Sequence, residues 1–246
     1  MIDTITPKKI NNKILQIKEE IEKINQLDNI KQKAILTLCI LDSYSQLNVF
    51  SNSGSNENAK KFEQFIEEFY PTNYWNDIGF VNLAYTIGYN GFKDKIEAIL
   101  GSSNMCISNY HGNAKVTELI NEMKENLINN SNFKVKVGDT LNKYISKYTY
   151  KSLFYKYRSK LIHDYTFPGL FDDMLDISFP CYISVIDDRR KEENNDTIFR
   201  DEYDLVFPYE FIKSVAIISI ENYLNKCLVN NIYPYSKYKE KFSWYE

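Results

Sequence analysis

Two residues with complementary chemistry lie in one short stretch, "YKYRSKLIHDYTFPG", which covers positions 155–169. It holds Arg158 and, five residues later, His163, one of two histidines in the chain. Histidine exchanges protons near neutral pH, whereas arginine stays charged and can hold two oxygens of one phosphate. The pair could therefore form one edge of an active site, or His163 could be a structural histidine on a core helix.

The spacing of the pair is not that of an ordinary helical contact. In an α-helix five residues turn by about 140° and rise by about 7.5 Å, so Arg158 and His163 are not expected to meet as i,i+4 neighbours do. They could still border one cleft from adjacent faces near a helix end. Asp164 could orient His163 or face solvent, and the divergence of about 100° between adjacent helical residues argues against direct pairing.

A basic, tyrosine-rich segment, positions 143–160, leads into the pair and contains no acidic residue. Lys143, Lys147 and Lys151 are four residues apart, which predicts one basic stripe on a helix. Cations could collect phosphates there, and tyrosines could stack on unpaired bases. A solvated lysine face over a tyrosine-rich core is the alternative. The residues that this hypothesis assigns to RNA binding are Lys151, Lys156, Lys160, Tyr157 and Tyr165.

The composition bounds the remaining possibilities. A net charge of −3 over 246 residues gives no overall basic surplus, so a nucleic-acid site would have to be a local patch. The four cysteines are widely separated and form no C-x-x-C pair, so we expect buried thiols in a reducing cytoplasm and no metal centre or other cofactor. No apolar run approaches a membrane span and the N-terminus has no apolar signal-peptide core, which predicts a soluble cytoplasmic protein.

Other candidate residues have simpler interpretations. His111 lies in "SNYHGNA", where a surface loop or helix-cap role is expected. Asp187 and Asp188 lie among mixed charges and are expected in a solvated hairpin turn rather than at a metal. The sequence contains no P-loop, Rossmann glycine pattern, H-E-x-x-H or G-x-S-x-G motif.

Helical periodicity dominates the elements that must position these side chains. We expect a single mostly α-helical domain over residues 1–246, with an inserted helical region at about 72–140. Alternating residues predict a β-hairpin at about 181–207, before the last core helix. The expected helices cover 8–28, 30–47, 59–71, 78–87, 92–100, 114–130, most of 140–165, and 207–231, and 132–139 is expected to be a strand or an extended linker.

This set of features resembles the HEPN (higher eukaryotes and prokaryotes nucleotide-binding) family. Members are α-helical bundles with an R-x4–6-H motif, and the motif here reads "RSKLIH" at positions 158–163. The resemblance is sharpest over 150–166 and looser over 30–71 and 205–230. Ser159 stands where the family more often has Asn, Asp or His.

The resemblance implies a metal-independent endoribonuclease whose site forms between two copies of the chain, so a homodimer. Cleavage of RNA without a metal needs a base for the 2′-hydroxyl, charge stabilisation at the phosphate and an acid for the 5′-oxygen. By this resemblance His163 would be the general acid or base, Arg158 the phosphate clamp and Ser159 a hydrogen-bonding group, and the product would end in a 2′,3′-cyclic phosphate. A bacterial toxin or anti-phage defence role is implied, with an antitoxin or defence-system protein as a further partner.

A second interpretation stays open at this point. Ser159 and the acidic overall charge favour a non-catalytic HEPN-like module that binds a protein partner, a nucleotide or RNA. The geometry around Arg158 and His163 distinguishes the two. An enzyme needs both side chains at a shared, solvent-open, positively lined cleft at a two-fold interface. A scaffold would bury His163 against a carbonyl or carboxylate, or place the pair on the surface of a lone monomer.

Overall fold

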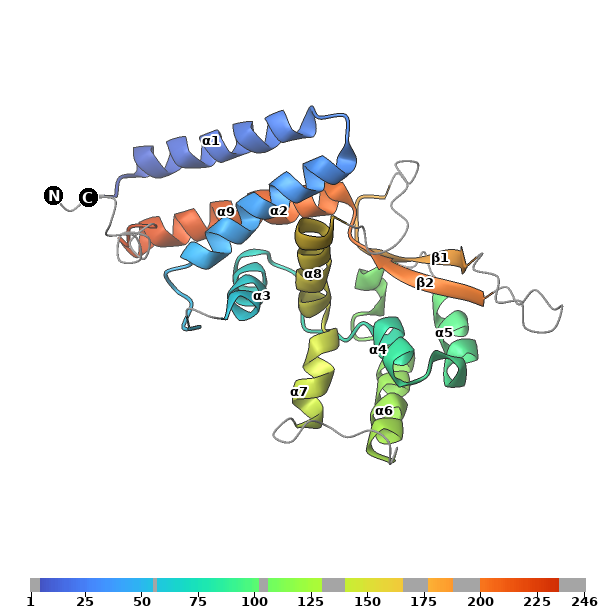
Figure 1. The fold of residues 1–246 in the computed structure, drawn as a ribbon. Coiled ribbons are helices and arrows are strands. Elements are labelled where there is room, and N and C mark those ends of the chain that lie inside the picture. The colour runs from blue at the N-terminus through green and yellow to red at the C-terminus, as the bar shows by residue number, and fades with distance from the viewer. Residues whose placement is uncertain are drawn as a thin grey trace. The chain divides into compact units, whose positions relative to one another are not determined.

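The computed structural model describes residues 5–54, 57–101, 106–129, 140–165, 177–187 and 200–234. This part of the chain is mostly helical with one antiparallel pair of strands, which confirms the predicted fold class of a mostly α protein with a small β-hairpin (Figure 1). None of the described helices combines the length and the apolar composition that a membrane span requires. The predicted extended segment 132–139 and the hairpin turn with Asp188 lie outside the described residues.

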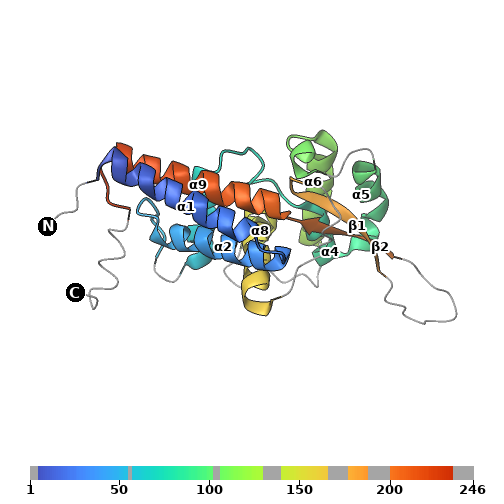
Figure 2. The same ribbon diagram turned by 90° about the horizontal axis from the view of Figure 1, so that it is seen from above.

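The chain forms two compact units. The first, here called the bundle unit, comprises residues 1–72, 158–165 and 209–246. Its long helix α9 packs against the other three main helices, and Figure 2 shows α1, α2 and α9 running alongside one another. The bounds of these helices are α1 Pro7–Asn25, α2 Ile30–Leu47, α3 Asn58–Phe69 and α9 Tyr209–Val229.

Local sequence explains how the bundle helices begin. The hydroxyl of Thr6 accepts a hydrogen bond from the backbone N–H of Lys9, and Pro7 occupies the first turn of α1. Asn29 caps α2 in the same way, through the N–H of Gln32 at 3.0 Å. The apolar faces of the four helices then meet in a mostly aliphatic and phenylalanine core, whose members include Ile10, Ile17, Ile21, Leu38, Leu41, Phe62, Phe65, Ile66, Ile212, Val215, Ile220 and Leu224.

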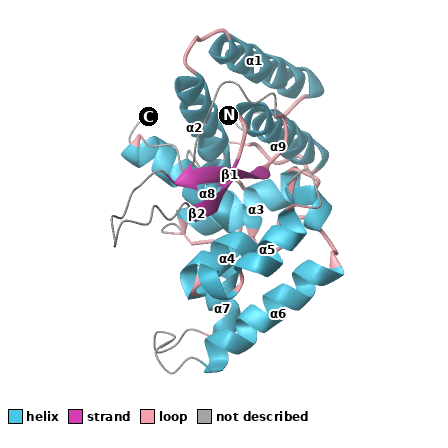
Figure 3. Ribbon diagram, turned by 90° about the vertical axis from the view of Figure 1, so that its right-hand side faces the viewer, coloured by secondary structure: helices cyan, strands magenta, loops and turns pink. Residues whose placement is uncertain are grey.

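The second unit, here called the hairpin unit, comprises residues 73–157 and 166–208. Helix α6 packs against α4 and α5, and the two strands pair with Cys181 opposite Val206 (Figure 3). Helix α8 begins in this unit, and its last two residues belong to the bundle unit. The bounds are α4 Phe80–Ile87, α5 Lys93–Leu100, α6 Ala114–Asn129, α7 Leu141–Ile145, α8 Tyr150–Ser159, β1 Cys181–Asp187 and β2 Arg200–Val206.

Aromatic side chains from distant segments form the core of the hairpin unit. The ring of Trp75 stacks on Phe154 with centroids 5.7 Å apart, and Phe154 packs on Phe207 at 4.8 Å. The hydroxyl groups of Tyr150 and Tyr182 are 3.4 Å apart in the interior. These contacts join the start of the unit, helix α8 and the end of the hairpin.

Candidate functional site

The segment that carries the motif is not a continuous α-helix. Helix α8 ends at Ser159, and a π-helical turn follows over Lys160–Asp164. In a π-helix the backbone hydrogen bond links residues i and i+5, so residues five apart lie over one another. α-Helical geometry excluded an ordinary i,i+4 contact and left a shared cleft open, and the π-helical turn brings the two side chains into direct contact. The Nη1 atom of Arg158 is 3.5 Å from Nε2 of His163.

Arg158 is anchored by a carboxylate that the sequence analysis did not single out. Its Nη2 donates to Oδ2 of Asp42 on α2 at 2.5 Å, and the arginine is 9 % exposed. The π-helical turn also contacts α2, so both elements of this pair belong to the bundle unit. One signal was available: Asp42 is the sole charged residue in the otherwise uncharged stretch from Ala34 to Leu47 of α2. A buried guanidinium needs such a partner.

His163 and the residues after it face solvent. His163, Asp164 and Tyr165 are all exposed, and within the described residues Asp164 makes no hydrogen bond or ion pair with His163. Tyr165 adopts a left-handed conformation with φ of 54° and ends the helical segment. Lys31 of α2 donates to its carbonyl oxygen, and the Lys31 ammonium lies 4.2 Å from the centre of its ring. The imidazole is therefore accessible beside a nearly buried cation.

The contact between the two side chains indicates the tautomer of His163. A guanidinium has donors and no acceptor, so Nε2 must accept in this contact and the proton of a neutral ring lies on Nδ1. At 3.5 Å the hydrogen bond is long and weak. Ser159, between the α-helix and the π-helical turn, is half-buried. Together these residues provide one cationic group, one proton-exchanging group and one hydroxyl on a single helix end.

The proposed RNA-binding residues do not form the continuous stripe that their spacing predicts. Residues 146–148 form a 3-10 turn, and Thr149 is extended and caps α8, with its Oγ1 accepting from the N–H of Ser152. Lys143 and Lys147 are exposed but belong to the segment before this break, while Lys151 is half-buried on α8. The prediction of one basic helical stripe is therefore wrong, because Thr149 interrupts the helix.

The remaining predicted RNA-binding residues differ in accessibility. Lys156 and Lys160 are exposed, and the Lys156 ammonium donates to the carbonyl of Lys147 at 2.8 Å. Tyr157 is 3 % exposed, and its ring packs edge-on against Phe207 at 5.4 Å. A ring in that position belongs to the core and is not available to stack on a base. Of the two tyrosines, Tyr165 is the accessible one.

The second histidine has a different partner. Nδ1 of His111 is 2.6 Å from Oδ2 of Asp77, and both side chains are about one-third exposed. His111 follows the 3-10 turn Ile107–Tyr110 at its C-terminal end, as the predicted loop or cap position implies. This pair lies in the hairpin unit and provides a matched comparison for His163.

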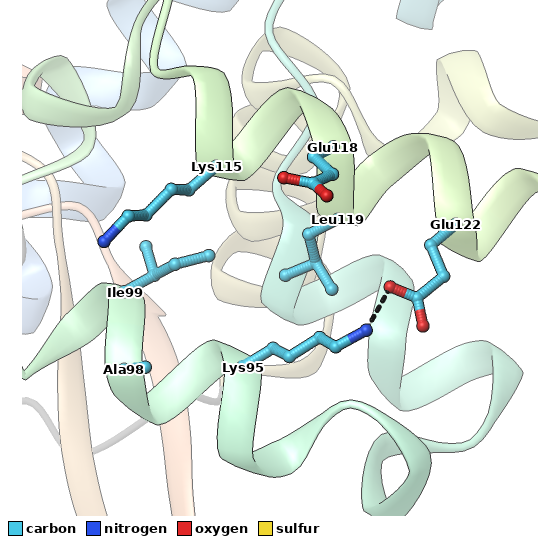
Figure 4. A pocket seen from close by; sticks show the side chains of 7 residues that line it. All are labelled: Lys95, Ala98, Ile99, Lys115, Glu118, Leu119 and Glu122. Carbon is cyan, nitrogen blue, oxygen red and sulfur yellow. Dashed lines mark hydrogen bonds and ion pairs between the residues drawn. The ribbon is translucent and has the colours of Figure 1, made fainter.

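A separate hollow of about 310 Å³ lies between α5 and α6 of the hairpin unit. The ammonium of Lys95 on α5 is 2.5 Å from a carboxylate oxygen of Glu122 on α6. Figure 4 shows this ion pair at one side of the hollow, next to Leu119 and with Ile99 also in the lining. None of the predicted site residues lines this hollow. Over the described residues no group of His, Cys, Asp and Glu side chains is arranged to hold a metal ion.

Comparisons of the chain with protein-family models, curated proteins and solved structures find no match.

Proposed function

We propose that the chain is a metal-independent endoribonuclease of the HEPN type, with Arg158 and His163 as catalytic residues. The observation that carries this proposal is an exposed imidazole held 3.5 Å from a guanidinium at one helix end. In this proposal two copies of the chain pair at that helix end, so that one RNA phosphate is contacted by both motifs.

The chemistry follows from what each group can do. The 2′-oxygen attacks the adjacent phosphorus, the P–O5′ bond breaks, and a 2′,3′-cyclic phosphate remains. A neutral His163 takes the proton of the 2′-hydroxyl, and a protonated His163 of the second copy gives a proton to the departing 5′-oxygen. Arg158 stabilises the added negative charge on the phosphoryl oxygens, and the Ser159 hydroxyl supplies a further hydrogen bond.

Asp42 has a positioning role in this scheme. Its ion pair with Arg158 occupies Nη2 and fixes the direction of the guanidinium, while Nη1 points to His163. A fixed dipole or charge stabilises a transition state without the cost of reorganising at each turnover. The same ion pair also reduces the positive charge that a phosphate would meet. Asp42 therefore weakens the attraction of Arg158 for the phosphate while it fixes the direction of the guanidinium.

The near-burial of Arg158 favours the second candidate, a non-catalytic module that binds RNA, a nucleotide or a protein partner. An arginine that is 9 % exposed and paired to Asp42 also fits a purely structural ion pair. Such a module would bind RNA in a salt-dependent manner and leave its length unchanged.

The decisive experiment incubates the purified full chain with single-stranded RNA in EDTA. Wild type should produce fragments with 2′,3′-cyclic phosphate ends. His163→Ala and Arg158→Ala should each lower the rate at least about 100-fold, the usual range for loss of a general acid–base group or of an oxyanion-stabilising donor. His111→Ala is the matched control, because it removes the other histidine, and it should cleave like wild type.

The outcomes separate the candidates. Uncut RNA with wild type, or equal cleavage by wild type and His163→Ala, would exclude the enzyme. Retarded but intact RNA in a gel-shift assay would then support the binding module. A toxin or defence role predicts that expression in bacteria arrests growth and that His163→Ala relieves the arrest.

A further inference from the structure

Two of the four cysteines, distant in the sequence, lie opposite each other in the hairpin unit. Cys106 immediately precedes the 3-10 turn Ile107–Tyr110, and Cys181 is the first residue of β1. An isolated antiparallel β-bridge joins them, and the N–H of Ile107 donates to the carbonyl of Pro180 at 3.0 Å. The backbone therefore fixes Cys106 and Cys181 as direct cross-strand neighbours.

The hydrogen-bond pattern defines which kind of neighbours they are. The bond runs from the residue after Cys106 to the residue before Cys181, so the two cysteines occupy a non-hydrogen-bonded pair. In such pairs the Cα atoms are about 4.5 Å apart, and opposed side chains point to the same face. A disulfide needs Cα atoms about 4.4–6.8 Å apart, so this backbone geometry is compatible with the bond.

The surroundings determine how the thiols would react. Cys106 and Cys181 are 7 % and 3 % exposed, and both are reduced. Burial, with a contribution from Cys106, raises the pKa of the Cys181 thiol to about 11. Since the thiolate is the nucleophile, oxidation at neutral pH should be slow, and the buried product should resist reductants equally well. The Cys106 sulfur lies 2.9 Å from Oγ of Ser108, so its side chain must rotate away from Ser108 before it can bond to Cys181.

We propose that Cys106 and Cys181 are a reversible disulfide pair that stabilises the hairpin unit under oxidising conditions. The oxidant is a small-molecule disulfide such as oxidised glutathione. One thiolate attacks it and releases a first glutathione thiolate, and the second cysteine then displaces the other glutathione from the mixed disulfide. Both cysteines are oxidised, one glutathione disulfide is reduced to two thiols, and two protons pass from protein to glutathione. The proposal is independent of the ribonuclease proposal.

The test equilibrates the full chain with mixtures of reduced and oxidised glutathione, in native buffer and in concentrated urea. Equilibrium is approached once from the oxidised protein and once from the reduced protein. Each sample is refolded in the redox buffer, so that slow access to buried thiols does not decide the result. After acid quenching, mass spectrometry of peptides gives the fraction of the 106–181 disulfide. That fraction gives the effective concentration of the Cys106 and Cys181 thiols for each other. This effective concentration should be roughly 100-fold or more higher in the native protein than in urea, because a compatible fold favours the bond.

Matched variants complete the test. The melting temperature of the oxidised wild type should exceed that of the reduced form by about 5 °C or more. Cys39→Ser, which removes the exposed cysteine, should keep this difference, and Cys181→Ser should abolish it. An effective concentration no higher in the native protein than in urea would overturn the proposal. Disulfides that join other cysteines, or glutathione adducts alone, would overturn it too.

Discussion

The cores of the two units are built in different ways. In the bundle unit, aliphatic side chains recur along the helices, as Ile10, Ile17 and Ile21 do at steps of seven and four residues on α1, beside a cluster of rings that includes Phe65, Phe69 and Tyr223. In the hairpin unit, a few large rings from distant segments meet, as Trp75 and Phe154 do. Aliphatic contacts are individually small and numerous, whereas each large ring concentrates much buried area in one side chain.

The two units also bury different polar groups. The bundle unit holds a charge pair, Arg158 with Asp42, near its surface. The hairpin unit buries neutral groups that can ionise, including the hydroxyls of Tyr150, Tyr157 and Tyr182. Loss of Asp42 or Arg158 should therefore destabilise the bundle unit, and alkali should destabilise the hairpin unit. The bundle unit also buries Tyr209 and Cys227, and burial raises the pKa of each.

The largest expected effect tests the concentration of stability in aromatic residues. Phe154→Ala removes a fully buried ring that contacts both Trp75 and Phe207. We expect the free energy of unfolding to fall by about 4 kcal/mol, because the substitution removes a fully buried ring and leaves a cavity in its place. Urea denaturation followed by circular dichroism measures this change. Ile128→Ala, at a position that is 68 % exposed, is the control and should change the value by less than about 0.5 kcal/mol. A loss below about 1 kcal/mol for Phe154→Ala would remove the contrast between the cores.

The next effect tests the buried charge pair of the bundle unit. Asp42→Ala leaves the Arg158 guanidinium nearly buried without its carboxylate, and we expect a loss of about 3 kcal/mol. The exposed Asp28→Ala is the control and should cost less than about 0.5 kcal/mol.

A double-mutant cycle identifies the cause of this loss. If an uncompensated charge is responsible, adding Arg158→Ala to Asp42→Ala should cost little more, so the two single losses are not additive. Additive losses would show that the pair does not couple, and the positioning role of Asp42 would fail with it.

The same contrast explains how far the sequence predicts this fold. Periodic helices such as α1 and α2 were predicted within a few residues, because the signal lies inside each segment. The division into α7, a 3-10 turn and α8 was not predicted. Thr149 can either continue a helix or cap one, and the helical pattern on both sides of it does not distinguish the two roles. The meeting of Trp75, Phe154 and Phe207 joins distant positions, and no periodicity within one segment encodes such a contact.

The candidate site shows the same limits. Arg158 and His163 were identified from residue type and spacing, but their direct contact depends on a π-helical turn, and the sequence was interpreted with α-helical geometry. Asp42 was missed because it is 116 residues away from its partner. Tyr157 was assigned to RNA because tyrosines are interleaved with lysines, although its place on α8 turns the ring toward Phe207.

A smaller effect tests the alkaline sensitivity of the hairpin unit. Burial raises the pKa of Tyr157 above its ordinary value of 10.0. The folded state therefore keeps a proton that the unfolded chain loses above pH 10, and stability falls as the pH rises. By pH 11 this hydroxyl alone should remove about 1.4 kcal/mol. Tyr157→Phe should show a shallower decline in the free energy of unfolding between pH 9 and 11, while the exposed Tyr165→Phe keeps the wild-type slope. Equal slopes for all three proteins would contradict the assignment.

The smallest effect concerns surface ion pairs, one in each unit. Lys18 of α1 pairs with Glu221 of α9 at 2.7 Å, and Lys95 pairs with Glu122 at 2.5 Å, with all four side chains at least one-third exposed. Exposed pairs contribute about 0.2–1 kcal/mol, because water and salt screen them. Lys18→Ala and Lys95→Ala should each cost less than about 1 kcal/mol, and part of that loss should disappear in concentrated salt. A loss of several kcal/mol for Lys95→Ala alone would mean that the hairpin unit depends on charge as well as on its rings, and the contrast between the two cores would then be wrong.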